Sequence, residues 1–389
     1  MSVMSFLFWL SALSVLYIYA GYPVLIALIA RILNRQVRSA EYLPTVSIVI
    51  PAHNEEGFIR ETLQNKLHLH YPPDHLEIIV ISDGSTDHTD IIVREFAPQG
   101  IRLLRQDPRQ GKTAALNRAV QDARGEILVF SDANSLFDKD ALGYLVGNFA
   151  DHAVGYVTGR MIYLHPGESV VGSGCSAYMR YENVLRQAES RVGSVVGVNG
   201  GIDAVRKALY EPLREDQQSD FVLPLTVVRK GYRVIYEPRA QSMENALERP
   251  DSEYKMRVRV ALRALHAIME MRSLLNICRF GIFSWQLMSH KVMRYMAFLP
   301  LIITYSSSLV LFSNASIYEI GFILQSIFYL SALLGWALTR SGGRTGLLYV
   351  PFYFCLLNVA SAHALWKAIR GTRTVVWQPR AGLLSGRAR

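Results

Sequence analysis

The sequence predicts an α/β fold, with a mostly parallel sheet covered by helices on both faces, joined to transmembrane α-helices. Between about residues 40 and 245, short apolar runs rich in strand-forming residues alternate with helix-forming segments. This alternation is typical of a parallel, Rossmann-like sheet with right-handed crossovers. Outside that region, residues 1–30 carry no charged side chain, and three further charge-free stretches lie near the C-terminus. The chain of 389 residues is 50% hydrophobic, a high content that is concentrated in these stretches.

The strands and helices of the middle region follow one another in a regular order. The segments expected to form strands are rich in Val and Ile and are bounded by turn residues; they are residues 46–50, 78–81, 101–104, 127–130, 154–163 and 232–236. A first helix is expected from near Glu56, with Asn54 as its N-cap. A second should end at about Phe96, and a third should span 111–124.

Four apolar stretches are long enough to cross the roughly 30 Å hydrocarbon core as helices. They are Phe6–Ala30, Tyr295–Tyr318, Ile320–Thr339 and Thr345–Trp366. The first has no basic residue before it and exceeds the apolar length of a signal peptide, which favours a membrane anchor. Buried core helices are the alternative for all four.

These features divide the chain into five expected regions. They are an N-terminal transmembrane helix with a basic linker (1–39), the sheet domain (40–250), amphipathic interface helices (251–294), three C-terminal transmembrane helices (295–366) and a basic tail (367–389). Residues 253–275 carry five basic side chains among apolar ones, a pattern typical of a helix at the lipid headgroups. An ordinary solvated helix is the other interpretation. The three cysteines are scattered, which supports neither a zinc site nor a disulfide framework.

The net charge of +9 does not indicate a nucleic-acid partner, because many basic residues cluster beside the apolar stretches. Examples are Arg31, Arg35, Arg38, Lys291 and Arg294. By the positive-inside rule the sheet domain faces the cytoplasm, on a multi-pass protein of a bacterial-type inner membrane. Four crossings would place the basic tail on the opposite side, against the same rule. A re-entrant C-terminal segment, or a further crossing near 280–288, would remove that conflict.

Two carboxylates follow directly after buried strands. Asp83 ends the run 77–82, and Asp132 ends the run 126–131. Ligands of open parallel sheets bind beyond the carboxyl ends of the strands. Asn134 stands two positions after Asp132, and in an extended stretch both side chains would point the same way. Their oxygens suit Mg²⁺ or Mn²⁺ bridging to a diphosphate, although Asp83 taken alone is equally well explained as a turn-capping residue.

Two further residues have charges suited to group transfer. Lys112 stands at an expected helix N-terminus, a position that favours anions. The spacing of a P-loop is missing there. Asp220 precedes an apolar stretch and would accept a proton from an attacking hydroxyl; taken alone, a surface acid is the more frequent explanation.

Taken together, four ordered motifs resemble family 2 glycosyltransferases, in particular the membrane-embedded branch with hyaluronan, chitin-oligosaccharide and poly-N-acetylglucosamine synthases. The motifs are Val46–Glu56, Ser82–Asp87, Gly111–Asn117 and Ser131–Asn134. The resemblance covers roughly residues 40–265 and the flanking apolar segments. It implies a GT-A fold, a nucleoside-diphosphate sugar donor, here a UDP-sugar, and inversion at the anomeric carbon.

The resemblance also implies roles for individual residues. Those on the donor side are Ala52, His53 and Glu55 in the uridine pocket, Asp83 at uracil or ribose, Lys112 near the nucleotide, and Asp132 with Asn134 at the metal and diphosphate. Those on the acceptor side are Asn199, Gly200, Gly201 and Arg259, with Asp220 as the catalytic base.

Three departures from the family pattern carry consequences. Ser219 replaces the acid that usually precedes the base, and Glu215–Asp216 forms a rival acidic pair. Asn134 replaces the usual second metal-binding aspartate. Of the Gln-x-x-Arg-Trp signature of processive synthases, only Arg259 remains.

Two hypotheses therefore stay open. The first is an inverting transferase that moves sugar to a glycan or lipid-linked acceptor at the cytoplasmic face, in extracellular polysaccharide biosynthesis, with membrane lipids and export or synthase proteins as partners. The second is a non-catalytic subunit of a synthase complex that binds nucleotide or glycan.

Overall fold

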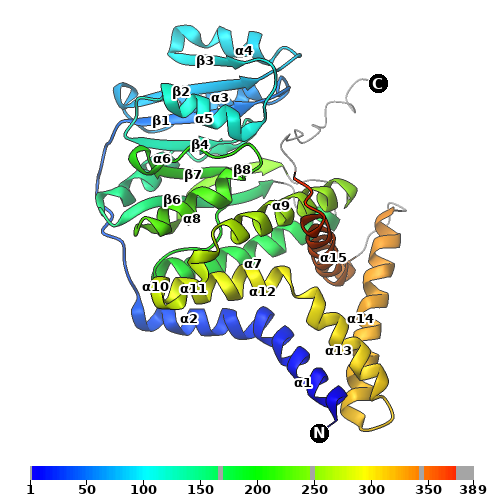
Figure 1. Cartoon of the computed structure of the whole chain (residues 1–389). Helices are drawn as coiled ribbons and strands as arrows, with labels where there is room; N and C mark the ends of the chain where they lie inside the picture. The colour runs from blue at the N-terminus through cyan, green and yellow to red at the C-terminus, as the bar shows by residue number, and fades with distance from the viewer. Residues whose placement is uncertain (1, 165–169, 246–249, 341–345, 374–389) are drawn as a thin grey trace. The chain divides into compact units, whose positions relative to one another are not determined.

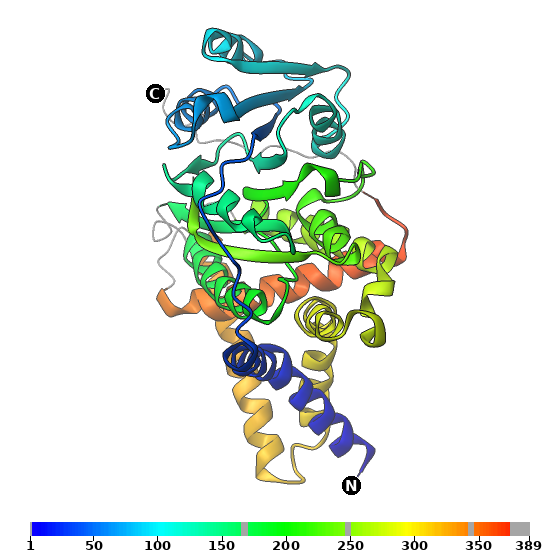
Figure 2. The same ribbon diagram turned by 90° about the vertical axis from the view of Figure 1, so that its left-hand side faces the viewer.

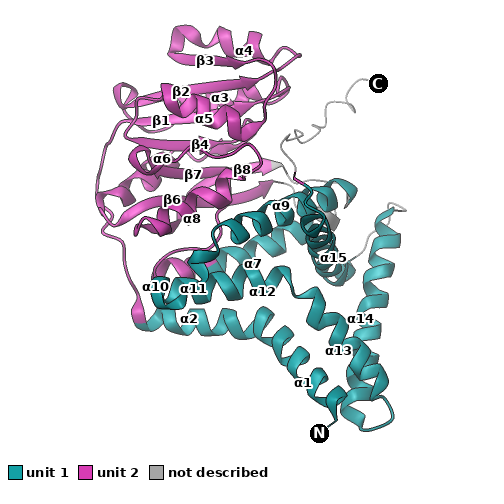
Figure 3. Ribbon diagram, viewed as in Figure 1, with its two compact units in different colours: residues 1–32, 165–185, 246–372 teal, residues 33–164, 186–245, 373–389 magenta. Residues whose placement is uncertain are grey.

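The computed structural model describes residues 2–164, 170–245, 250–340 and 346–373. These residues form two compact units, coloured separately in Figure 3. One unit contains the sheet and consists of residues 33–164, 186–245 and 373–389. The other is helical and consists of residues 1–32, 165–185 and 246–372. The boundary between them runs through α7 (Val170–Val192).

The sheet unit is built on eight strands in the order β3-β2-β1-β4-β7-β6-β8-β5, most of which can be followed in Figure 1. They are β1 (Val46–Ala52), β2 (Leu76–Asp83), β3 (Ile101–Gln106), β4 (Ile127–Ser131), β5 (Leu136–Phe137), β6 (Val154–Leu164), β7 (Ile202–Arg206) and β8 (Arg233–Asn245). The β3-β2-β1-β4 half is parallel, as is the β6–β8 pair. β7 runs antiparallel to both of its neighbours, and β5 runs antiparallel to β8.

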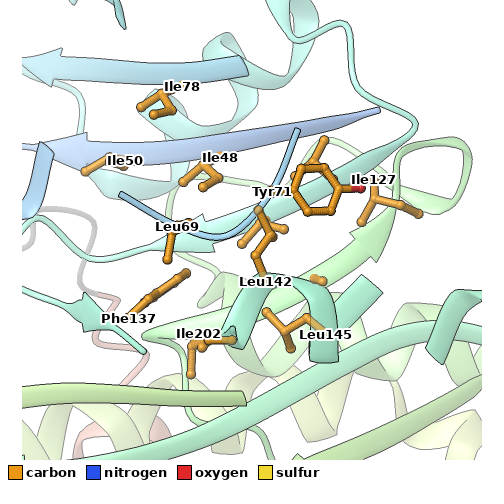
Figure 4. Close-up of a cluster of buried hydrophobic side chains, with 14 of the residues drawn as sticks. Ile48, Ile50, Leu69, Tyr71, Ile78, Ile127, Phe137, Leu142, Leu145 and Ile202 are labelled. Atoms are coloured by element: carbon orange, nitrogen blue, oxygen red, sulfur yellow. The ribbon is translucent and has the colours of Figure 1, made fainter. Parts of the chain in front are cut away.

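The helices of this unit include α3 (Ile59–Leu67), α4 (Thr89–Glu95), α5 (Lys112–Asp122), α6 (Ala141–Gly147) and α8 (Ser219–Arg229). Every residue of β1 is buried, so its two faces both need cover. On one face, strand residues such as Ile48 and Ile50 form a core with Leu142 and Leu145 of α6 (Figure 4). Burying each such side chain contributes about 1.5–3 kcal/mol relative to exposure.

The mostly parallel, Rossmann-like part of the prediction is confirmed, and all six predicted strands are present with longer bounds. Two details were wrong. Strands β5 and β7 were not predicted: β5 has only two residues, and β7 carries the acid Asp203 at its second position and ends at Arg206. Asn54 does not cap a helix: it has a left-handed backbone (φ 54°), and its side chain accepts a hydrogen bond from the Thr86 N–H (2.8 Å). The helix begins later, at Ile59.

The helical unit starts with α1 (Val3–Leu16) and α2 (Tyr22–Leu33), joined by a π-helical turn, η1 (Tyr17–Gly21). Its later helices are α9 (Pro250–Glu270), α10 (Ile277–Phe280), α11 (Ile282–Leu287), η8 (Met288–Val292), α12 (Met293–Tyr295), α13 (Phe298–Val310), α14 (Ser316–Arg340) and α15 (Tyr349–Ile369). α1 and α13 run side by side in Figures 1 and 2, joined by a hydrogen bond from Thr304 to Ser11 (2.8 Å).

Three described segments are long and apolar enough to span a membrane: Val3–Leu33, Ser316–Arg340 and Gly346–Ile369. The expected fourth, Tyr295–Tyr318, contains only the 13-residue α13. At 1.5 Å per residue that helix is about 20 Å long, which is shorter than the hydrocarbon core. Among the described C-terminal helices, α13 is thus too short to span alone, and a crossing by residues 295–318 stays a prediction.

The basic helix expected at 253–275 corresponds mainly to α9, and one of its faces is buried within the helical unit. Val258, Leu262 and Leu265 pack with Ala360 and Ala364 of α15. This face is therefore covered by protein and faces neither solvent nor lipid headgroups.

Candidate functional site

The sheet unit brings together four of the residues singled out in the sequence. Lys112, Asp132, Gly200 and Asp220 line one small cavity beside the ends of β1 and β4. The remaining lining residues are Pro51, Leu116, Phe130, Ser131, Tyr156, Asp203 and Ser219. The cavity measures about 10 Å³, room for about one water. A cavity of this size is too small for a sugar ring.

Lys112 and Asp132 form an ion pair across this cavity. Lys112 begins α5 directly after Gly111, whose positive φ (100°) needs no Cβ and allows the sharp entry into the helix. Burial alone would lower the pKa of Lys112, but the carboxylates of Asp132 and Asp220 outweigh it, and the pKa is raised. Lys112 therefore stays cationic, at a helix N-terminus that itself attracts anions.

Asp220 lies in the first turn of α8. Its carboxylate packs directly on Gly200, which adopts a left-handed conformation (φ 84°). A Cβ at Gly200 would overlap Oδ2 of Asp220 and lie 3.1 Å from its Cγ. Both the backbone conformation and the space thus require glycine here, and Gly200 forms the wall against which the acid is held.

Asp203, which the sequence reasoning missed, belongs to the same cavity. It is 1% exposed and accepts a hydrogen bond from the Gly200 N–H (2.9 Å). Burial raises the pKa of Asp203 to about 7, and the neighbouring Asp220 adds to the rise. A carboxylate inside an apolar strand is the signal that would have found it, because such acids are almost never buried without a partner.

Asp83 is 1% exposed and is held by the loop that follows β3. Its oxygens accept hydrogen bonds from the N–H groups of Gln110 (2.8 Å) and Gly111 (2.9 Å) and from the Gln106 side chain (2.8 Å). Asp83 thus fastens the loop that leads into Lys112. A direct contact with uracil or ribose stays a prediction.

The residues expected in the uridine pocket, Ala52, His53 and Glu55, are all buried at the end of β1. His53 Nδ1 hydrogen-bonds to the Asp83 carbonyl (2.7 Å), and the Glu55 N–H donates to Thr89 Oγ1 (2.8 Å). These contacts join the ends of β1 and β2 into one polar rim. Their role toward a nucleotide is not tested by the structure.

The geometric reason for pairing Asp132 with Asn134 does not hold. The chain is not extended here: it forms a turn in which the Ser135 N–H donates to the Asp132 carbonyl (3.2 Å). Asn134 lines a separate small cavity with Glu61 and Glu244.

A divalent cation would therefore find one carboxylate, Asp132, at the main cavity. No group of three or more His, Cys, Asp and Glu suited to a metal occurs among the described residues. This donor set fits Mg²⁺ in its usual mode, with one or two protein oxygens and the remaining ligands from diphosphate and water.

The acceptor-side residues fall in two places. Asn199 donates its side-chain amide to the Gly159 carbonyl, and its N–H donates to Thr158 Oγ1 (3.2 Å). A Cβ at Gly201 would meet Glu244 Oε1 at 2.6 Å, so this turn also packs too closely for a side chain. Arg259 lies on α9 in the helical unit, and it is not among the described residues that line the cavity.

The rival acid Asp216 is engaged elsewhere. It accepts from Arg214 (3.1 Å) and Arg373 (2.6 Å), and hydrogen bonds from these arginines hold its pKa below the ordinary value despite some burial. Glu215 and Asp216 do not line the cavity described above, whereas Asp220 does.

Comparisons with known proteins show which proteins the chain is similar to. Residues 47–201 match the model of glycosyl transferase family 2. The probable glycosyltransferase YdaM of Bacillus subtilis is 31% identical over 234 residues, 56% of this chain and 55% of that protein. Poly-beta-1,6-N-acetyl-D-glucosamine synthase of Staphylococcus epidermidis is 25% identical over 294 residues, 74% of this chain and 70% of that protein.

A beta-monoglucosyldiacylglycerol synthase of Nostoc is 31% identical over 169 residues, 42% of this chain and 36% of that protein. The matches thus span about half of YdaM and about a third of the Nostoc enzyme. Among solved structures, a mannosyltransferase of Pyrobaculum calidifontis, in complex with GDP-Man and Mn²⁺, superposes with a TM-score of 0.69. It is 24% identical, covering 92% of this chain and 98% of that one, so the two share a fold.

Proposed function

We propose that the chain, whose residues 47–201 match the family 2 glycosyltransferase model and whose fold is GT-A-like, is an inverting transferase of a nucleotide-activated sugar. The donor is a UDP-sugar and the acceptor is a hydroxyl of a glycan or lipid-linked molecule. The reaction takes place at the cytoplasmic face of a bacterial-type inner membrane, in extracellular polysaccharide biosynthesis. The relatives support this range, since their names describe both a polysaccharide synthase and a glycolipid synthase.

The single observation that carries the proposal is the convergence of Lys112, Asp132 and Asp220 on one cavity. They come from α5, the end of β4 and α8, and more than a hundred positions separate the first from the last. A cation for the leaving group and a carboxylate for the nucleophile are the two charges that an in-line displacement requires.

The chemistry follows from these charges. Asp220 removes the proton of the acceptor hydroxyl as that oxygen attacks the anomeric carbon, a general-base effect worth about 10²–10⁴-fold. Lys112 and the N-terminus of α5 stabilise the negative charge on the departing diphosphate, and attack from the side opposite to it inverts the carbon. Asp132 would hold Mg²⁺ or Mn²⁺, whose charge adds to that stabilisation when the ion is bound, and Asn134 would join it only if the turn after β4 rearranges.

The remaining assignments are part of the same proposal. Ala52, His53, Glu55 and Asp83 bind the nucleotide, and Asn199, Gly200, Gly201 and Arg259 bind the acceptor. The buried polar rim at the ends of β1 and β2 supports the first set. The tight turn at Gly200 beside Asp220 supports the second.

A donor screen tests the proposal. The full-length protein in detergent is incubated with Mg²⁺ or Mn²⁺ and a panel of UDP- and GDP-sugars, and release of nucleoside diphosphate is measured. We expect turnover with a UDP-sugar that is lost on chelation of the metal. UDP binding without turnover of any donor would instead favour the non-catalytic synthase subunit, for which Ser219 and Asn134 are the motivating departures.

A further inference from the structure

The helical unit encloses a cavity of about 350 Å³ that the proposed transfer chemistry does not use. All of its lining residues belong to this unit, and they come from η1, α7, α9, η8, α12 and α15. Its volume lies within the range of small-molecule sites, about 300–1,000 Å³. It is therefore large enough to hold a head group or one end of a larger molecule.

Small side chains keep this space open. Gly174 and Ala177 of α7, Ala261 of α9 and Ser361 of α15 all line it. Gly174 also lets the ring of Tyr353 pack against the helix, since a Cβ there would lie 2.8 Å from the ring. Larger residues at these positions would fill the cavity.

One wall carries a buried charged cluster. Glu182 is 1% exposed and pairs with Arg294 (2.7 Å) and His290 (3.3 Å). The guanidinium of Arg294 lies over the rings of Tyr178 (5.3 Å) and Tyr181 (4.9 Å). These contacts hold the arginine in place at the cavity wall.

The charges of the described lining residues favour an anionic occupant. Arg257, Lys291 and Arg294 are cationic, and Glu182 is the one carboxylate among them. Glu253, outside the lining, pairs with Arg257 (2.7 Å). With both Glu182 and Glu253 counted, and with His290 taken as neutral, these residues carry three positive and two negative charges.

The remaining walls are apolar and come from segments suited to a bilayer. Val350, Phe354 and Leu357 of α15 line the cavity, as does Tyr19 of the N-terminal segment. Both helical segments are candidate membrane spans. An occupant with an apolar chain would thus meet the same surfaces that a bilayer does.

We propose that this cavity binds the head group and adjoining chain of a phosphate-bearing lipid. The cationic wall receives the phosphate, and the α15 wall receives the chain. This lipid site is a separate assignment from the proposed transferase function and goes beyond it.

The test compares a filled cavity with a matched surface change. Ala177→Phe fills the cavity from α7, and Ser361→Phe fills it independently from α15. Val184→Phe enlarges a residue of α7 that is 64% exposed and lies outside the lining. Each full-length variant in detergent is incubated with a polyprenyl phosphate, with a phosphatidylglycerol or with a neutral diacylglycerol. Retained lipid is measured by native mass spectrometry.

We expect wild type and Val184→Phe to retain a phosphate-bearing lipid, and the two filled variants to retain at least about tenfold less. Comparing polyprenyl phosphate with phosphatidylglycerol shows which source supplies the phosphate. Equal retention by the filled variants would overturn the site, and equal retention of diacylglycerol would overturn the phosphate assignment.

A second readout separates this inference from the proposed function. UDP binding is measured for each variant beside lipid retention, and the filled variants should lose the lipid but keep their affinity for UDP. Loss of both together would attribute the lost lipid to misfolding and overturn the cavity assignment. Absence of donor turnover in wild type, with lipid still bound, would reject the transferase and leave a lipid-binding cavity.

Discussion

At the scale of single residues, the backbone conformation of Gly200 determines where the carboxylate of Asp220 lies. Substitution Gly200→Ala places a Cβ against the Asp220 carboxylate and forces a side chain to φ 84°. The backbone strain costs about 1–2 kcal/mol, and displacement of the acid should reduce kcat by about tenfold or more. Thermal unfolding and donor turnover measure the two effects separately.

Gly231→Ala is the control for this prediction. Gly231 has nearly the same backbone (φ 89°), but a Cβ there would meet nothing within 4 Å. It should show a similar loss of stability with little loss of activity. Equal activity losses in the two variants would mean that strain alone, and not the position of Asp220, explains the effect.

Asp203 should make stability depend on pH. Its pKa is raised to about 7 in the folded chain, against about 3.9 when unfolded. Its contribution to stability is thus fully present below the unfolded pKa and is lost as the pH rises through 7. Between about pH 5 and pH 8 this amounts to roughly 3 kcal/mol, which Asp203→Asn removes.

Thermal unfolding of both proteins at the two pH values measures this difference. The Tm of Asp203→Asn, relative to wild type, should rise from about pH 5 to about pH 8. A constant difference would show that Asp203 is ionised throughout this range.

A site residue can be predicted from the sequence when a motif of neighbouring residues marks it. Lys112, Asp132 and Asp220 stand at starts and ends of elements, where the motifs are local, and the structure brings them together. Asp203 was missed because no motif in its own short segment marks it, and its neighbours in the cavity, such as Tyr156 and Asp220, come from other elements. The prediction that the Asn134 and Asp132 side chains point the same way failed because a turn follows β4, and the alternation of residues in a strand does not reveal such a turn.

At the scale of elements, the α9–α15 pair depends on a buried ion pair. Glu253 accepts hydrogen bonds from Arg257 (2.7 Å) and from the Tyr353 hydroxyl of α15 (2.7 Å). Substitution Glu253→Gln leaves the Arg257 charge buried without its carboxylate, which should destabilise the helical unit by about 3 kcal/mol. Asp251→Asn, an exposed acid in the same helix, should have little effect.

Thermal unfolding in detergent, monitored by circular dichroism, compares these two variants with wild type. An unchanged Tm for Glu253→Gln would show that the pair does not hold the helices together.

Local patterns predicted the strands well but not the antiparallel partner β7. Five short runs of Val and Ile, and one longer mixed run, marked the predicted strands. The position of β7 between β4 and β6 is a long-range pairing. The charges of α9 suggested an exposed helix, whereas Arg257 is satisfied internally by an acid four positions earlier.

At the scale of the whole molecule, the side of the membrane reached by the tail depends on how many helices cross after the sheet domain. Two candidate spans follow it, Ser316–Arg340 and Gly346–Ile369. We predict that these two cross and return the basic tail to the side of the sheet domain, which the positive-inside rule favours. The conflict met in the sequence arises only if the short α13 is counted as a further span.

Cysteine labelling in intact bacterial cells tests this topology. With Cys278 replaced by Ser, Thr372→Cys should react with a membrane-impermeant thiol reagent only after permeabilisation. Ser2→Cys, on the other side of the first span, should react in intact cells. Labelling of Thr372→Cys in intact cells would place the tail outside and contradict the inference.

Donor turnover by Asp220→Asn tests the convergence of charges on the sheet cavity most directly. The substitution keeps the shape of the side chain and removes its basicity, so kcat should fall by about 100-fold or more while UDP affinity is retained. Asp216→Asn, a nearby acid paired with arginines, should keep activity close to wild type. Retained turnover in Asp220→Asn, or an equal loss in Asp216→Asn, would contradict the assignment of Asp220 as the base.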